Sequence, residues 1–343
     1  MQNKTYRVAV LGATGAVGRE MLSVLDEQRF PASEVVALAS PRSVGEEVEY
    51  GNRTLKVQAA TPESFDGIDL VLASAGSAVS KQLLPEAARR GALCIDNSSA
   101  FRMVEGVPLV VPEVNAAAMA KHNGLIANPN CSTIQMVVAL GPLHERAGLK
   151  RVVVSTYQSV SGAGKKGMDE LSSQTIALLN QKPFDVAVHH ARIAFNVVPH
   201  IGSAGEGGYT DEEWKLVYES RKIMGLPDLE VVPTCVRVPV FCGHSETVYC
   251  EFERPISVAE AREIFGKAHG IKLVDDLANK QYPMPLDCAE TDPVYVGRIR
   301  QDPNRPNALT LWVVADNLRK GAATNAVQIA WLAAKTGLVH GAK

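Results

Sequence analysis

Short apolar runs alternate with helical stretches through the first third of the chain. Residues 6–11 form a valine-rich run that leads into a glycine-rich turn, and Met21, Leu22, Val24 and Leu25 then follow at the spacing of one helix face. The same alternation predicts four further elements: strands at 35–39, 69–73 and 92–95 and a helix at 81–90. Alternating β and α units predict a parallel, doubly wound sheet.

The pattern changes after about residue 130. Longer strand-like stretches occupy 151–160 and 229–252, with helices and long loops between them, which predicts an α+β second domain. Apolar residues recur at helical spacing from 317 to 336 and stop at Gly337, as expected for a helix that returns to the first domain. We therefore expect domain boundaries at 1–130, 131–316 and 317–343.

Length and composition agree with two globular domains. The 343 residues exceed the ~150 typical of one domain, and 46% are hydrophobic against 21% charged, which excludes intrinsic disorder as the main state. The 35 basic and 37 acidic residues give a net charge of −2, so neither nucleic acid nor a membrane surface is an expected partner. No apolar run approaches the ~20 residues of a membrane span, and no leader peptide is recognisable, so we expect a cytoplasmic protein.

The six cysteines are too sparse for a disulfide scaffold and form no CxxC pair. We expect reduced thiols and no metal site.

A glycine motif lies between the first strand and the first helix. Gly12, Gly15 and Gly18 match GxxGxxG, in which glycine lets the backbone approach a pyrophosphate at a helix N-terminus. A tight turn without a ligand is the alternative. The position of the motif favours dinucleotide binding.

The end of the second predicted strand indicates which dinucleotide. An NAD site usually offers an acidic residue there, but this chain offers Ser40, Pro41, Arg42 and Ser43. Guanidinium and hydroxyl groups suit a 2′-phosphate, which favours NADP. Arg42 as a solvated surface residue is the alternative.

Cys131 lies in the segment Asn-Pro-Asn-Cys-Ser-Thr, directly before an apolar helical run at 134–143. A thiolate at a helix N-terminus is stabilised by the unpaired backbone N–H groups and the helix dipole. The local features fit a nucleophile, although buried inert thiols are common.

Six motifs together resemble the aspartate-β-semialdehyde dehydrogenase family along nearly the whole chain. They are GATGAVG at 12–18, SPRS at 40–43, NSSAFR at 97–102, NPNCST at 128–133, YQSVSGAG at 157–164 and RVPVFCGH at 237–244. The resemblance implies NADPH-dependent reductive dephosphorylation of 4-phospho-L-aspartate to L-aspartate 4-semialdehyde, a step toward lysine, methionine, threonine and diaminopimelate. It also implies that Cys131 attacks the acyl phosphate and forms a thioester.

The resemblance assigns roles to further residues. His244 is the implied acid–base residue, because imidazole exchanges protons near neutral pH. Arg237 is implied to grip the substrate α-carboxylate, with a surface ion pair as the alternative. Strand alternation places Arg237 on the face opposite Val236, Val238 and Val240, away from the packed face.

Residues 210–215 read as a helix start in which Thr210 and Glu213 form a capping box. Glu212 and Lys215 then share a face, either as a surface salt bridge or as site residues, while Trp214, Val217 and Tyr218 are expected to pack. The resemblance implies that Glu212 holds the substrate amino group and that Gln158 contacts substrate beside Cys131. It further implies that Lys215 and Arg102 bind phosphate.

For the cofactor, small residues near the sheet edge and at 161–164 suit close approach of a dinucleotide. The expected NADP contacts are Gly12, Thr14, Gly15, Ala16, Val17, Gly18, Ser40, Arg42, Ser43, Ser74, Ala75, Gly76, Ser161, Gly162 and Asn317. Asn325 is expected to be a buried packing residue. The other seven histidines, namely His122, His144, His189, His190, His200, His269 and His340, are interpreted as structural or surface residues.

The resemblance implies that 1–130 bind NADP, that 131–316 form the catalytic and dimerisation domain, and that the protein is a homodimer or a dimer of dimers. Residues 165–180, apolar at helical spacing, are a candidate contact element. Two alternatives remain. N-acetyl-γ-glutamyl-phosphate reductase has a similar plan but does not need to recognise a free amino group, and a catalytically silent NADP-binding regulator could keep the fold.

Overall fold

The structure, a computed structural model, describes residues 4–339 and contains two compact units. One unit is drawn from two parts of the chain, up to Asn130 and from Ala322 onward. The other is the continuous segment Cys131–Gly321. Each unit contains one six-stranded sheet.

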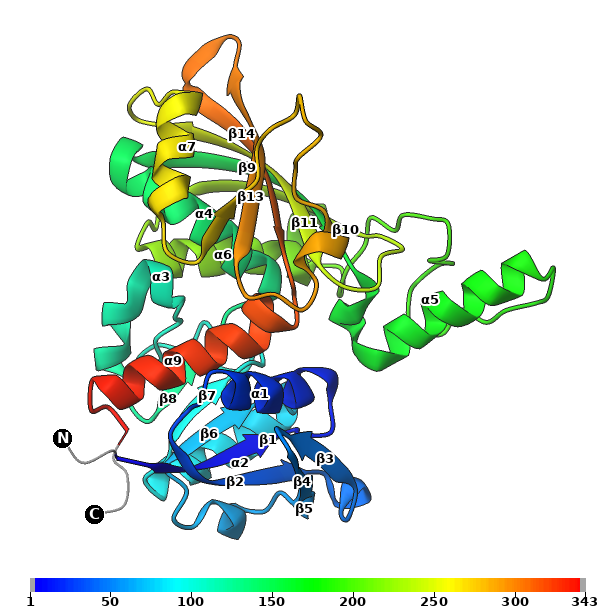
Figure 1. The fold of residues 1–343 in the computed structure, drawn as a ribbon, viewed down its shortest axis with the longest axis vertical. Coiled ribbons are helices and arrows are strands. Elements are labelled where there is room, and N and C mark those ends of the chain that lie inside the picture. Colours follow the sequence, from blue (N-terminus) through cyan, green and yellow to red (C-terminus); the bar gives the residue numbers. More distant parts are fainter. Residues whose placement is uncertain (1–3, 340–343) are drawn as a thin grey trace. The chain divides into compact units, whose positions relative to one another are not determined.

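The first unit contains a parallel sheet with the strand order β5-β2-β1-β6-β7-β8, as the alternating pattern predicts (Figure 1). Its strands are β1 (Tyr6–Leu11), β2 (Ala32–Ala39), β5 (Gln58–Ala59), β6 (Leu70–Ala73), β7 (Leu93–Asp96) and β8 (Leu125–Ala127). A separate hairpin joins β3 (Glu47–Tyr50) to β4 (Arg53–Lys56).

Helices cover both faces of this sheet, which makes it doubly wound. On one face α1 (Ala16–Glu27) and α9 (Thr324–Lys335) bury Leu22 and Val327 in a core with Val10 and Ile95. On the other face lies α2 (Ser77–Arg89), near Cys94. A short helix, α3 (Pro112–Asn115), precedes β8. The returning helix begins at Thr324, later than the spacing from 317 predicts, because 319–323 form one wider π-type turn.

The second unit is built on a mixed sheet with the order β10-β9-β11-β14-β13-β12. Its strands are β9 (Leu149–Gln158), β10 (Glu230–Arg237), β11 (His244–Phe252), β12 (Ile271–Leu273), β13 (Val294–Asp302) and β14 (Arg305–Ala315). Its helices are α4 (Cys131–Ala147), α5 (Gly164–Leu179), α6 (Asp211–Met224), α7 (Val258–Lys267) and α8 (Pro285–Cys288). Within residues 4–339, no helix combines the length and the apolar character that crossing a membrane requires.

Candidate functional site

Cys131 is the first residue of α4 and is half-buried. The following turn, from Ser132 to Gln135, is buried, so the helix is fixed in the unit and its N-terminus is a rigid position. Gly321 lies against Cys131, and a Cβ added to Gly321 would be 2.8 Å from the Cys131 Cβ. The N-terminal position confirms the expectation from the sequence, and it favours the thiolate form of Cys131.

One face of the second sheet gathers the polar residues that the motifs single out. Gln158 and Arg237 are register partners on the parallel strands β9 and β10. On β11, His244 and Glu246 alternate with residues of the opposite face, and Glu246 pairs with Thr156 of β9. Since side chains alternate along strands, all five point to the same side of the sheet.

The expected placement of Arg237 away from the packed face is wrong. Arg237 is only 6% exposed and shares its face with the buried Cys235, while Val232 on the other face is 38% exposed. The sequence pattern misleads because α4 and α6 cover the face that carries the polar residues. The strand also ends at Arg237, so Val238 lies beyond it.

Arg237 and His244 are held against the loop that follows β9. Arg237 Nη1 donates a 2.7 Å hydrogen bond to the Ser159 carbonyl. A Cβ on Gly162 would lie 2.8 Å from Arg237 Nη1 and 3.4 Å from His244 Nε2. Gly162 therefore contacts the two proposed substrate-side residues, and its lack of a side chain leaves room for them.

His244 is completely buried. Burial, and then the nearby positive charge of Arg237, lowers its pKa to about 3, against an opposing effect of Glu212. Burial and the positive charge of Arg237 thus favour the neutral imidazole. The physical cause is desolvation of the charged form.

Gln158, Glu212 and Lys215 form a chain of contacts beside this face. Gln158 Nε2 donates to Glu212 Oε1 at 3.1 Å, and Lys215 Nζ lies 2.9 Å from Glu212 Oε2. Glu212 is only 7% exposed, so the pair is more than a surface salt bridge. The predicted capping box of Thr210 and Glu213 is present.

The capped helix packs somewhat differently from the expectation. Val217 is buried, but Tyr218 is 44% exposed and stacks on Trp214, because the buried face of α6 runs through Glu212 and Leu216 instead.

Asn317 lies in the second unit, seven residues before α9, and not in that helix. Its Oδ1 accepts hydrogen bonds from the Gly243 N–H and from the hydroxyls of Ser159 and Ser161, each at 3.0 Å. Three donors on the oxygen fix the orientation of the amide.

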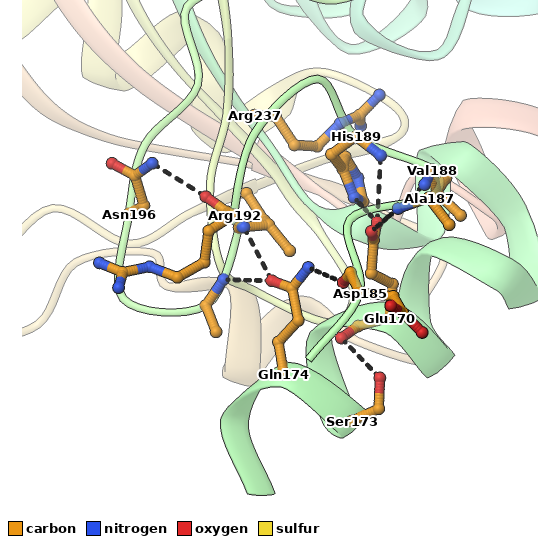
Figure 2. Close-up of polar contacts among 12 residues, drawn as sticks. Glu170, Ser173, Gln174, Asp185, Ala187, Val188, His189, Arg192, Asn196 and Arg237 are labelled. Carbon is orange, nitrogen blue, oxygen red and sulfur yellow. Dashed lines mark hydrogen bonds and ion pairs between the residues drawn. The ribbon is translucent and has the colours of Figure 1, made fainter. Parts of the chain in front are cut away.

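A polar network organises the long irregular segment after α5 (Figure 2). The Glu170 carboxylate accepts hydrogen bonds from the N–H groups of 187–189 and lies 2.6 Å from His189 Nδ1. Burial opposes ionisation of Glu170, but these hydrogen bonds outweigh it and lower the pKa. Gln174 similarly accepts from the N–H groups of residues 193 and 194. The segment then pairs with the backbone of Arg237 through Val198.

The other histidines fit the structural or surface interpretation where contacts are resolved. His189 belongs to the network above, and the rings of His190 and His200 stack with centroids 4.2 Å apart. His340 lies outside the described residues. All six cysteines are thiols, and burial raises the pKa of Cys242 to about 12, with Asp316 adding to the shift.

In the first unit, the glycine motif borders a cavity of about 410 Å³ at the carboxyl ends of β1, β2 and β6. Of the expected cofactor residues, it is lined by Gly12, Thr14, Gly15, Ser40, Ser74 and Ala75. A Cβ on Gly12 would lie 2.4 Å from the Ser74 carbonyl oxygen, and one on Gly18 would lie 2.1 Å from the Gly12 oxygen. Glycine is therefore required at both positions.

The remaining expected cofactor residues of this unit lie around the cavity but outside its lining. Ala16, Val17 and Gly18 form the first turn of α1, and Gly76 precedes α2. Arg42 and Ser43 belong to the single turn Pro41–Ser43 after β2, and Arg42 is exposed.

Arg102 also belongs to the first unit, where it is only 8% exposed. Its guanidinium donates to the carbonyls of Asn128 and Asn97 at 3.0 and 2.9 Å. Asn325 is fully buried and donates to the Val110 carbonyl and to Asn128 Oδ1, as expected of a packing residue.

Three residues near the site were given no role by the sequence motifs. Ser159 contacts both Arg237 and His244, and Gln135, one turn after Cys131, donates from Nε2 to the His244 carbonyl at 3.3 Å. Glu246 is fully buried, and burial raises its pKa well above that of an ordinary carboxyl group. For Gln135 and Glu246 the general signal is their spacing, four positions from Cys131 on a helix and two positions from His244 on a strand.

Family models match both units. The model described as semialdehyde dehydrogenase, NAD binding domain, matches residues 7–122, and the model described as semialdehyde dehydrogenase, dimerisation domain, matches 140–320. These matches, with the fold and the cysteine at the start of α4, define the class: a nucleotide-binding semialdehyde dehydrogenase.

Individual relatives narrow the class. The chain is 51% identical over 340 residues to the aspartate-semialdehyde dehydrogenase of Bacillus subtilis (strain 168), covering 97% of this chain and 98% of that protein. The chain belongs to the aspartate-semialdehyde dehydrogenase family, which confirms the resemblance.

Solved structures agree. Aspartate semialdehyde dehydrogenase II from Vibrio cholerae, complexed with ASA, is 46% identical with a TM-score of 0.94, covering 97% of this chain and 99% of that one. The enzyme from Candida albicans, solved with NADP, is 25% identical with a TM-score of 0.76, covering 98% and 100%.

Proposed function

We propose that the protein catalyses the NADPH-dependent reductive dephosphorylation of 4-phospho-L-aspartate to L-aspartate 4-semialdehyde, and the phosphorylating oxidation in reverse. The observation that carries the proposal is the second-unit cluster: a cysteine at a helix N-terminus in the same unit as Gln158, Glu212, Arg237 and His244. The names of the Bacillus and Vibrio relatives support this substrate. The reaction is a step toward lysine, methionine, threonine and diaminopimelate.

In this mechanism the thiolate of Cys131 attacks the acyl carbon, the C–O bond to phosphate breaks, and a thioester forms on the sulfur. Arg237 binds the substrate α-carboxylate through its guanidinium, and Glu212 binds the ammonium group. The two opposite charges complement an amino acid zwitterion. Gln158, hydrogen-bonded to Glu212, positions the substrate beside the sulfur.

NADP is the cofactor we propose, and the first-unit cavity fits it. Gly12 has no side chain and Ser74 and Ala75 have small ones, so a pyrophosphate can reach the start of α1. Arg42 and Ser43, beside the cavity, suit the 2′-phosphate, and Gly162, Ser161 and Asn317 suit the nicotinamide half. When bound, NADPH supplies the hydride that reduces the thioester.

Lys215 and Arg102 are the residues that we propose for phosphate binding. The Lys215 ammonium donates to the Glu212 carboxylate, and the Arg102 guanidinium donates to the Asn128 carbonyl. Both cationic groups are therefore oriented before a ligand arrives. Two cations offset the charge of a phosphate dianion.

We also propose a cytoplasmic homodimer or dimer of dimers. The matched dimerisation model supports self-association. Helix α5 presents Ile176 and Leu179, which are 60% and 73% exposed, as a candidate contact element. A monomeric mass in light scattering at working concentration would contradict the assembly.

The test is phosphate-dependent reduction of NADP by the purified protein with L-aspartate 4-semialdehyde. We expect turnover that falls to background in Cys131→Ala and persists in Cys250→Ala, a matched loss of a thiol six residues along β11 from His244. NAD and N-acetyl-glutamate semialdehyde serve as competing substrates. Turnover of the acetylated substrate alone would refute the roles of Glu212 and Arg237, and full activity without Cys131 would refute the thioester.

A further inference from the structure

Thr156 lies two residues before Gln158 on β9, and its side chain points to the same face of the sheet. The Thr156 hydroxyl lies 3.0 Å from Gln158 Oε1. Both residues are buried, so neither group can exchange this contact for one with water. Strand β9 pairs with β10 on one side and with β11 on the other, which fixes both backbones. The contact is therefore a built-in feature of the site.

The charges beside Gln158 allow its amide only one orientation. Lys215 Nζ lies 2.9 Å from Glu212 Oε2, so Glu212 is a carboxylate, which accepts hydrogen bonds and donates none. Gln158 accordingly turns its Nε2–H toward Glu212 Oε1, at 3.1 Å. A reversed amide would set its oxygen against the carboxylate oxygen, and both atoms carry negative partial charge. Gln158 Oε1 thus faces Thr156, and because an amide oxygen only accepts, the Thr156 hydroxyl is the donor.

The other neighbours of Thr156 offer its hydroxyl no comparable acceptor. Its register partners are Cys235 on β10 and Glu246 on β11. Burial raises the pKa of the Cys235 thiol, and a neutral thiol is a weak acceptor. Neither carboxyl oxygen of Glu246 takes part in a hydrogen bond within residues 4–339. The Thr156 proton is therefore committed to Gln158.

We propose that Thr156 is a positioning residue that fixes the Gln158 amide and, through it, the Glu212 carboxylate. The inference rests on the proposed function, in which Gln158 and Glu212 face the substrate, and it adds a residue that acts through them. A continuous chain of hydrogen bonds runs from the Thr156 hydroxyl through the Gln158 amide to Glu212, and Lys215 donates to Glu212 from the other end. Groups that are oriented before substrate arrives need no reordering in the reaction.

The variants Thr156→Val and Thr156→Ser separate the hydroxyl from the shape of the side chain. Valine has nearly the shape of threonine but lacks the hydroxyl, whereas serine keeps the hydroxyl and lacks the methyl group. We expect kcat/KM for L-aspartate 4-semialdehyde to fall about three- to tenfold in Thr156→Val, as for the loss of one neutral hydrogen bond. It should stay within about twofold of wild type in Thr156→Ser. Equal losses in the two variants would assign the effect to packing and overturn the proposal.

Two internal controls accompany these kinetics. KM for NADP should be the same in both Thr156 variants as in wild type, because the hydrogen-bonded chain lies on the substrate side. Thr247→Val makes the same chemical change on β11, on the opposite face of the sheet from Glu246, and should leave the kinetics unchanged. A loss in Thr247→Val as large as that in Thr156→Val would assign the effect to the sheet in general and would also overturn the proposal.

NMR of the full-length protein with ¹⁵N-labelled glutamine side chains tests the orientation without any turnover. The Gln158 amide is assigned by the signals that are lost in Gln158→Leu. We expect its N–H protons to exchange slowly with solvent in wild type and in Thr156→Ser, because the amide is buried and held at both ends. In Thr156→Val the signals should shift and exchange about three- to tenfold faster.

Unchanged Gln158 signals in Thr156→Val would overturn the proposal, whatever the kinetics. A wild-type protein that does not turn over L-aspartate 4-semialdehyde would instead refute the proposed function. The NMR signals would still decide whether Thr156 fixes the amide, so the two failures are distinguishable.

Discussion

The substitution Gly162→Ala tests how tightly the substrate side of the site is packed. The added Cβ would lie 2.8 Å from Arg237 Nη1, whereas ordinary contact begins at 3.4 Å, so the groups must separate by 3.4 − 2.8 = 0.6 Å. Arg237 cannot swing away freely, because it is buried and donates to the Ser159 carbonyl at 2.7 Å. The backbone of Gly162 is outside the left-handed region, so alanine itself introduces no strain.

A misplacement of about 1 Å in an active site can cost about 100-fold in rate, so a shift of 0.6 Å predicts a loss of kcat/KM of about tenfold or more. The loss should fall mainly on KM for L-aspartate 4-semialdehyde, since Arg237 is proposed to bind its carboxylate. The assay is phosphate-dependent NADP reduction at varied semialdehyde concentration.

Gly266→Ala is the matched control. Gly266 lies in α7, where a Cβ meets nothing within 4 Å, so kinetics should not change and stability should rise by about 0.5–1 kcal/mol. Kinetic constants for Gly162→Ala within about twofold of wild type would refute the reasoning about Arg237, and a change confined to KM for NADP would place Gly162 on the cofactor side alone.

Three further variants test other parts of the structure. Burial raises the pKa of Glu246 in the folded protein, so the contribution of its protonated form to stability is present below the ordinary carboxyl pKa and is lost as pH rises toward the raised value. Glu246→Gln should flatten the fall of Tm as pH rises above the ordinary carboxyl pKa, and an unchanged slope would exclude Glu246 as its source. Gly18→Ala forces a Cβ against a backbone oxygen 2.1 Å away and should cost about 1–3 kcal/mol in urea unfolding; wild-type stability would contradict the close packing. Glu170→Ala removes the acceptor for three backbone N–H groups, so trypsin should cleave after Arg192 several-fold faster, and unaltered cleavage would show that the network does not hold this segment.

The first unit follows its sequence pattern closely because local periodicity and packing agree there. The apolar run at 6–11 is β1, and the helix face carrying Leu22 and Leu25 is buried as predicted. The start of α4 at Cys131 and the cap at Thr210 follow from short-range rules that act within one turn.

The second unit shows what a sequence pattern cannot supply. Arg237 lies on the buried face because two helices cover the polar side of the sheet, and periodicity gives an alternation without saying which side is covered. The strands β13 and β14 form a hairpin with each other, but β14 also pairs with β11, which is remote in sequence, and nothing local indicates that second pairing. The low pKa of His244 likewise arises from tertiary burial.

Ser159 could not be assigned from the sequence for a different reason. Its contacts to His244 and Arg237 are made by the backbone N–H and carbonyl, which every residue except proline possesses. Only the path of the chain after β9 distinguishes this position from any other serine.

The division of the first unit between the two ends of the chain has a consequence for biosynthesis. The core of that unit includes Val327, Ala330 and Ala333 of α9, which leave the ribosome after all of Cys131–Gly321. A nascent chain ending anywhere before this helix keeps apolar positions of the parallel sheet uncovered, whereas the continuous second unit has all of its strands sooner. Truncations of only a few helical turns at the C-terminal end should therefore expose the nucleotide-binding sheet to chaperones and proteases, although they remove no residue of the cysteine site.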